Sequence, residues 1–214
     1  MRADAAVVAG ERCRVAARLC RIEPRFREVH ERHGAPPWRR TPNSFASLGR
    51  TIVYQQVAGS AAAAVWRRVC RLYPGGRFPT PERLAATPRE ALLGAGLSRQ
   101  KATYLHDLAA AYLSGAIRPR RFDSLSDDEV RATLTAVRGI GAWTADIFLM
   151  FDLLRPDILP LGDYGLRQGF QLLLELEELP DADAMRRCAE SWRPHRSHAC
   201  WYLWRLLEDG RRPA

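Results

Sequence analysis

Two features that could do chemistry lie close together in the stretch VRGIGAWTADIFLMFDLLRPDILPLGDYG, residues 137–165. Gly139-Ile140-Gly141 predicts a tight turn that opens an apolar helix, because glycine permits left-handed backbone and leaves no side chain in the way. The first amides of such a helix point outward at the positive end of its dipole, which suits a phosphate. An ordinary connection between two helices would use the same residues. About twenty residues later, Asp163 lies in a glycine-rich bend.

The charge of the chain favours a polyanionic partner. The 214 residues carry a formal net charge of +9, which points first to nucleic acid. A solubility charge in an arginine-rich proteome is the alternative. Lys101 is the only lysine, so Lys101 and the N-terminal amine are the only amines that could act as nucleophiles.

The cysteines and the hydropathy exclude several other classes of protein. The five cysteines form no CxxC pair, so neither a zinc site nor a disulfide framework is indicated. Iron–sulfur ligation needs four closely set thiolates, and the C-terminal region has only Cys188 and Cys200. We therefore expect buried thiols in a reducing cytoplasm and no iron–sulfur cluster. No apolar run approaches the roughly 18–20 residues that cross a bilayer, so no membrane partner is expected.

Helical spacing of apolar residues dominates the chain, which predicts an all-α protein. Ser126 and Glu129 have the spacing of a capping box at the start of one helix. We expect a single domain over 1–214 with two lobes, about 45–135 and about 1–44 plus 136–214, and a ligand cleft between them. The predicted helices cover 24–34, 44–56, 59–76, 98–115, 126–137, 164–178, 182–191 and 195–208, with short helices in TPERLAA and PREALLGAG.

The motifs together resemble those of a known superfamily. LTAVRGIGAWTADIFLMF resembles the helix-hairpin-helix of DNA repair glycosylases, and the proline- and glycine-rich segment that ends in Asp163 resembles the segment that follows it. IVYQQVAGSAAAAVW, FPTPERLAATPREALLGAGLSRQKATYLHDLA and SWRPHRSHACWYLWRL resemble segments of 3-methyladenine DNA glycosylase II, the alkylation-damage branch. The resemblance covers about residues 25–208 and is to a short form without an N-terminal β-rich domain.

The resemblance implies a monofunctional glycosylase of base excision repair. It would flip an alkylated purine such as 3-methyladenine or 7-methylguanine out of double-stranded DNA, hydrolyse the N-glycosidic bond and leave an abasic site. Asp163 matches the catalytic aspartate, which stabilises positive charge on the deoxyribose; a helix N-cap before Tyr164 is the alternative and is compatible with it. Trp143 occupies the position of the lysine with which bifunctional relatives form a Schiff base.

The same resemblance assigns an aromatic pocket for the flipped base. Trp143, Tyr164 and Trp204 match base-stacking positions, and cation–π attraction of ~0.5–2 kcal/mol would favour positively charged alkylpurines. Core packing is the alternative for each of them. Ile147 stands where relatives often have an aromatic residue, so the cage is reduced. Core packing is the preferred interpretation of the remaining candidates, Trp66, Trp192 and Trp201.

Further residues are assigned to DNA contact by position. Gln56, or alternatively Gln55, matches the wedge that fills the gap left by the flipped base. The hairpin would grip the DNA backbone, and Arg138 replaces a frequent proline. The main-chain carbonyls of Thr135, Val137 and Ile140 match a site for a monovalent cation. The hairpin contacts are assigned to Arg138, Gly139, Ile140, Gly141 and Thr144.

Several polar residues near these motifs have open or structural interpretations. Arg196 matches a family position and is either a salt-bridge anchor or a phosphate contact. Asp157 is expected to be structural, and Asp146 could face the cleft. His195 and His198 are expected to be surface or packing residues.

The remaining expectations concern cofactors, assembly and alternatives. No cofactor is required beyond an optional cation in the hairpin, and we expect a monomer in a bacterial cytoplasm, associated with the nucleoid. The same fold acting on uracil, hypoxanthine or etheno bases is one alternative. A non-catalytic module that only binds DNA is the other.

Overall fold

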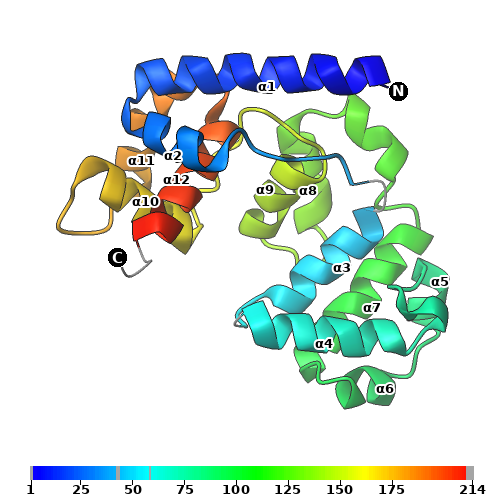
Figure 1. Ribbon diagram of the computed structural model, residues 1–214. Coiled ribbons are helices and arrows are strands. Elements are labelled where there is room, and N and C mark those ends of the chain that lie inside the picture. Colours follow the sequence, from blue (N-terminus) through cyan, green and yellow to red (C-terminus); the bar gives the residue numbers. More distant parts are fainter. Residues whose placement is uncertain (1, 42–43, 58, 211–214) are drawn as a thin grey trace. The chain divides into compact units, whose positions relative to one another are not determined.

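The computed structural model describes residues 2–41, 44–57 and 59–210, and within these ranges it is helical with no strand. This confirms the predicted fold class (Figure 1). The chain divides into two compact units: a central unit, Arg40–Leu153, and a terminal unit, Met1–Arg39 with Leu154–Ala214. Residues 136–153 therefore pack with the central unit, whereas the sequence pattern placed them with the C-terminal helices.

The central unit is built around one long helix. α7 (Arg99–Leu113) packs against α3 (Ser44–Tyr54), and the short helices α5 (Pro81–Ala85) and α6 (Arg89–Gly94) cover it. Its buried face consists of apolar side chains at helical spacing, as the sequence predicts. The unit also contains α4 (Gly59–Arg71), α8 (Asp127–Thr135), α9 (Ala142–Phe151) and the 3-10 helices η1 (Pro74–Gly76) and η2 (Pro119–Ser124).

The terminal unit joins the two ends of the chain. α10 (Tyr164–Leu174) packs closely along α12 (Arg196–Gly210), because Gly169 has no side chain: a Cβ there would lie 2.8 Å from the Leu203 carbonyl oxygen. The core contains Phe26 and Trp192, both almost fully buried. The remaining elements are α2 (Arg25–His33), α11 (Ala182–Ala189) and η3 (Glu190–Trp192).

One helix was not predicted. α1 (Arg2–Ile22) precedes α2 in the terminal unit (Figure 1), and its apolar residues are spread among charges rather than gathered in a clear stripe. Over the described ranges, no helix combines the length and apolar character needed to cross a bilayer.

Local chemistry explains most of the helix ends. Ser126 and Glu129 form the predicted capping box at the start of α8. α4 ends at Arg71 rather than at 76, because Pro74–Gly76 form a separate turn in which Gly75 has positive φ. α10 ends at Leu174 rather than at 178, because Glu175 adopts the left-handed conformation (φ 52°).

Candidate active site

The turn between α8 and α9 has the geometry of a glycine hairpin. The Ile140 N–H donates to the Val137 carbonyl at 3.0 Å, and Gly139 has a φ of 91°. A Cβ on Gly139 would overlap the ring of Tyr104 on α7, so the hairpin lies directly against that helix. Glycine is required at this position for both the backbone conformation and the close approach.

The start of α9 has a glycine where α7, α8 and α10 have a serine or aspartate whose side chain caps the helix. Gly141 is its N-cap, and glycine has no side chain with which to cap the helix. Gly141 and Ala142 are exposed, so the first amides of α9 lie at an open helix N-terminus. Such amides, together with the helix dipole, favour an anion. Arg138 is exposed beside them, with its guanidinium carbon 5.9 Å from the centre of the Tyr104 ring.

Side-chain contacts hold the two hairpin helices together. Arg131 Nε on α8 donates to Asp146 Oδ1 on α9 at 2.8 Å. Asp146 is 8% exposed, and its burial raises the pKa of the carboxyl although Arg131 opposes the rise. This ion pair gives Asp146 a structural role in joining α8 to α9.

Gln55 connects the end of α3 to the hairpin. Its side-chain Nε2 donates to the Gly139 carbonyl at 2.9 Å and to Thr144 Oγ1 at 3.2 Å. Thr144 is 2% exposed, so its hydroxyl is used inside the protein rather than on the surface. Gln56 is exposed and has a positive φ of 53°.

The end of α3, the start of α7 and the hairpin with α9 line a cavity in the central unit that is open to solvent and has a volume of about 960 Å³. Polar and aromatic groups from three parts of the sequence meet in it, although they are up to about 90 residues apart. The walls include Gln55, Gln56, Lys101, Tyr104, Gly139 and Trp143.

Asp163 caps α10 in the terminal unit, as one interpretation of the sequence predicts. Its Oδ1 accepts hydrogen bonds from the Leu166 N–H at 2.6 Å and from the Trp204 indole Nε1–H at 3.0 Å. Asp163 is half-buried. The N-cap therefore fixes the direction of the carboxylate, and a tryptophan from α12 fixes it a second time.

The other aromatic candidates in the terminal unit differ in exposure. Tyr164 follows the cap and is 62% exposed, which is unusual for so large a side chain. Trp204 is half-buried, with Gly165 packed beside its ring: a Cβ on Gly165 would lie 3.6 Å from Trp204 Cδ1. Trp192 and Trp201 are buried among aromatic neighbours, and Trp66 stacks on Phe78. These last three pack as expected.

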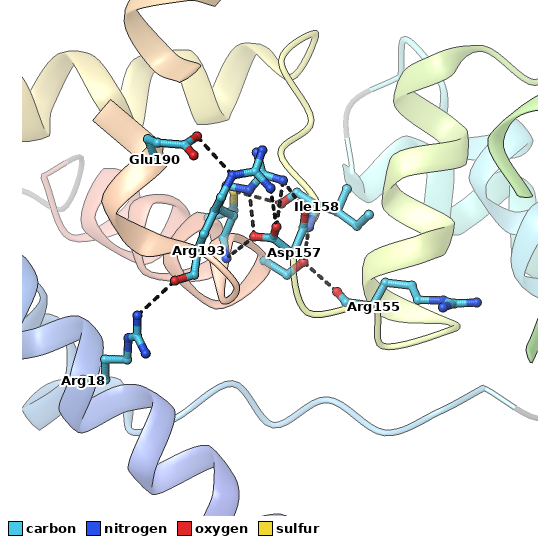
Figure 2. A network of polar contacts seen from close by, with 9 residues as sticks. Arg18, Arg155, Asp157, Ile158, Glu190 and Arg193 are labelled. Carbon is cyan, nitrogen blue, oxygen red and sulfur yellow. Dashed lines mark hydrogen bonds and ion pairs between the residues drawn. The ribbon is translucent and has the colours of Figure 1, made fainter. Parts of the chain in front are cut away.

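A polar network fixes the segment between α9 and Asp163 onto α12 (Figure 2). Arg196 donates from Nε to Asp157 Oδ1 at 2.7 Å and from Nη2 to Oδ2 at 2.9 Å, and Arg193 adds a contact at 2.8 Å. Buried Ser197 donates to the Arg155 carbonyl and accepts from the Ile158 N–H. Asp157 is thus structural, and Arg196 is its salt-bridge anchor.

The two histidines at the start of α12 are packing residues in this structure. Trp38 lies against His198, with ring centres 5.2 Å apart. Burial lowers the pKa of His198 to about 4 and also lowers the pKa of His195. The His198 ring is therefore neutral at pH 7.

The predicted cation site would be made of main-chain oxygens rather than side chains. Among the described residues, no group of three or more histidine, cysteine, aspartate or glutamate side chains is arranged to hold a metal ion. The Val137 carbonyl accepts the Ile140 N–H within the turn. A site made of the main-chain oxygens of Thr135, Val137 and Ile140 stays a prediction.

The structure thus gathers the predicted residues into two groups. Asp163, Tyr164 and Trp204 lie together in the terminal unit, and the hairpin, Trp143 and the two glutamines lie together in the central unit. Sequence reasoning missed the Trp204–Asp163 hydrogen bond and the Gln55–hairpin contact. Both join residues that are distant in sequence, and neither leaves a periodic signal.

An open helix start behind a glycine hairpin, followed by an aspartate that caps the next helix, defines a helix-hairpin-helix protein of the DNA glycosylase fold. The chain belongs to the HhH-GPD superfamily of base excision DNA repair proteins, whose sequence pattern matches residues 50–194.

Individual proteins support this membership. The chain is 33% identical over 172 residues to DNA-3-methyladenine glycosylase 1 of Schizosaccharomyces pombe, which covers 79% of this chain and 75% of that protein. Solved structures agree. The S. pombe 3-methyladenine DNA glycosylase in complex with abasic DNA has a TM-score of 0.75 at 30% identity, covering 85% of this chain and 88% of that one. The DNA-3-methyladenine glycosidase of Bacillus halodurans also has a TM-score of 0.75, at 34% identity, covering 88% and 86%.

Proposed function

We propose that this protein is a monofunctional DNA glycosylase of base excision repair. It flips alkylated purines such as 3-methyladenine and 7-methylguanine out of double-stranded DNA, hydrolyses their N-glycosidic bond and leaves an abasic site. The observation that carries the proposal is Asp163, whose carboxylate is held by the Leu166 amide and the Trp204 indole in a chain of this superfamily. The names of its relatives support the substrate class.

The role of Asp163 follows from the charge that develops in the reaction. Breaking an N-glycosidic bond builds positive charge on the deoxyribose, and a fixed carboxylate stabilises that state more than the ground state. The same group can orient the attacking water. A carboxylate already held by two donors undergoes little reorganisation when the charge appears, which is the condition for a large electrostatic effect.

The hairpin supplies a grip on the DNA backbone. The first amides of α9, behind the exposed Gly141 and Ala142, and the exposed Arg138 would bind phosphate and position the duplex without reading its sequence. Gly139 and Ile140 shape the turn. Since the hydroxyl of Thr144 is used by Gln55, Thr144 would contact DNA through its backbone N–H in the first turn of α9.

Aromatic side chains would receive the flipped base. Tyr164 offers an exposed ring next to Asp163 in sequence, and Trp143 lines the cavity of the central unit. A positively charged alkylpurine gains cation–π attraction of ~0.5–2 kcal/mol over a normal base on such rings. Trp204 has a second task, because its N–H is committed to Asp163.

Gln56 is the better candidate for the wedge. Its side chain is exposed at a left-handed position, whereas the amide of Gln55 is bound to Gly139 and Thr144. Filling the gap left by the flipped base requires a side chain that is accessible from solvent, and this condition selects Gln56.

The absence of lyase chemistry is proposed from the lysine. Lys101 is the only lysine of the chain, and its Nζ donates to the carbonyls of Val53 and Gln55 at 2.6 Å each. An amine held in this way is not available to attack a sugar. We further expect a cytoplasmic monomer that requires no cofactor, with a cation at the hairpin carbonyls as an optional aid to phosphate binding.

The proposal is tested by measuring base release from duplex DNA treated with a methylating agent, with the wild type and Asp163→Asn side by side. We expect the wild type to release 3-methyladenine and the variant to fall by at least about 100-fold, equivalent to ~2.7 kcal/mol of transition-state stabilisation. DNA binding without any release by the wild type would overturn the alkylpurine proposal. A panel of uracil, hypoxanthine and ethenoadenine duplexes would then separate another glycosylase from a DNA-binding module.

A further inference from the structure

The end of α3 is held by a cation from another helix. Lys101 lies in the first turn of α7, and its Nζ donates to the carbonyl oxygens of Val53 and Gln55, both at 2.6 Å. The last carbonyls of a helix have no partner within the helix, and they lie at the negative end of its dipole. An ammonium group satisfies two of them at once and places its charge where the dipole favours it.

The next residue after this clamp is Gln56. It adopts a φ of 53°, a left-handed conformation that costs about 1 kcal/mol or more for a residue other than glycine or asparagine. Such a conformation persists only when the surrounding structure holds it in place. Lys101 binds the carbonyl that directly precedes Gln56, so it acts on the peptide unit that sets the direction of this side chain.

A second contact ties the same segment to the hairpin. The side chain of Gln55 donates to the Gly139 carbonyl and to Thr144 Oγ1. Gln55 is therefore held through its own carbonyl by Lys101 and through its side chain by the hairpin. These contacts to the backbone and to the side chain of Gln55 fix the segment that carries Gln56.

We propose that Lys101 is a positioning residue for DNA recognition, and that its ammonium holds the end of α3 so that Gln56 projects as the wedge. This inference rests on the wedge role in the proposed function. It also explains why the sole lysine lies inside the cavity: burial lowers the pKa of Lys101, and the two carbonyl contacts compensate for that burial. The amine serves the protein backbone, not the sugar.

A double-mutant cycle in DNA binding tests this role without requiring catalysis. The full-length protein is measured on two duplexes of the same sequence, one intact and one with a tetrahydrofuran abasic-site analogue, and the affinity ratio is taken. Gln56→Ala should lower this ratio by about tenfold, because the gap is no longer filled. Lys101→Met keeps the aliphatic stem but removes the donors, and it should lower the ratio by a similar factor. The double variant should lose no more than either single variant.

A matched control separates positioning from general destabilisation. Ser98 Oγ accepts the Lys101 N–H and caps α7, so Ser98→Ala weakens the same helix end without touching the carbonyls of α3. Its effect on the affinity ratio should be small, and additive with that of Gln56→Ala. Lys101→Arg, which keeps charge and donors, should restore part of the ratio.

The inference is overturned if Lys101→Met leaves the ratio unchanged, if its effect multiplies with that of Gln56→Ala to about 100-fold, or if Gln56→Ala has no effect. If the effects of Lys101→Met and Gln56→Ala are not additive but the wild type releases no base, the proposed glycosylase activity is wrong and the positioning role of Lys101 is supported. If the wild type releases the base but the effects of Lys101→Met and Gln56→Ala are independent, the glycosylase activity stands and the positioning role of Lys101 is wrong.

Discussion

The two helix starts that follow the glycine-rich turns differ in one respect. The N-cap of α9 is Gly141, which has no side chain to cap the helix, whereas the N-cap of α10 is Asp163, whose Oδ1 accepts the Leu166 N–H at 2.6 Å. Both helices expose the positive end of a dipole. At α10 the cap residue itself places an anion against the first amides, whereas the glycine at the α9 cap cannot do so.

The difference shows how one backbone feature serves two purposes. An open N-terminus attracts phosphate without reading bases, so it suits a contact with any DNA sequence. A capped N-terminus holds a carboxylate rigidly, and Trp204 from α12 holds it again. The residue type at the cap thus decides whether the first amides of a helix meet a carboxylate on the cap itself.

The largest expected effect separates capping from catalysis at α10. Asp163→Asn and Asp163→Ala should both lower base release by at least about 100-fold. Asparagine is also a good N-cap, so only the alanine variant should lose about 1 kcal/mol of unfolding free energy. Single-turnover kinetics and urea denaturation measure the two quantities. Equal stability of the two variants would show that the cap contributes little.

The second prediction tests the glycines of the α9 hairpin against each other. Gly139→Ala should destabilise the protein by about 2–3 kcal/mol, because of its positive φ and the overlap with Tyr104. Gly141→Ala should change stability by less than about 1 kcal/mol, since nothing lies within 4 Å of its Cβ and φ is −91°. Denaturation curves for both variants check this, and comparable losses would contradict the described packing of the turn.

A smaller effect is expected from the second donor to Asp163. Trp204→Phe keeps an aromatic ring but removes the indole N–H, and a hydrogen bond to a charged group contributes roughly 1.5 kcal/mol or more. Base release should fall about tenfold. Trp201→Phe, on the same helix but away from Asp163, should leave the single-turnover rate unchanged. If Trp204→Phe does not lower the rate of base release further in the Asp163→Asn variant, the indole acts through the carboxylate.

The smallest effect concerns the open helix start. Arg138→Ala should weaken binding to all DNA sequences by about fivefold near 0.15 M salt and reduce the slope of log affinity against log salt by about 0.9. Arg186→Ala, which removes an exposed arginine paired with Asp183 on α11, should leave the slope unchanged. Fluorescence anisotropy over a salt series measures both. An unchanged slope for Arg138→Ala would show that the residue makes no phosphate contact.

Local rules accounted for most of the fold. Helical spacing identified α2–α12, and the capping box of Ser126 and Glu129 was predicted in detail, because caps depend on residues three or four apart. α1 was missed, since its apolar residues are scattered among charges. Residues 136–153 were assigned to the second lobe but belong to the central unit. The unit that α9 joins depends on its packing against α3 and α8, which no local pattern encodes.

The candidate site was predicted in part for the same reason. The Gly139–Gly141 turn and the cap at Asp163 are short-range features. The indole on Asp163 comes from 41 residues away, the clamp on α3 from 46, and the glutamine on Gly139 from 84. Such contacts require the helices to be placed in space before a donor can be matched to an acceptor.

The sequence by itself determined an all-helical protein, a net charge of +9 and the order of hairpin and aspartate, since these depend on composition and on short-range spacings. The tertiary structure decided how those residues are held. Trp204 was assigned to base stacking, and its indole N–H also donates a hydrogen bond to Asp163. Gln55 was a candidate wedge, and its side chain donates a hydrogen bond to the hairpin. A side chain with several donors takes the partner that folding brings within about 3 Å, and that partner is fixed by packing between distant segments.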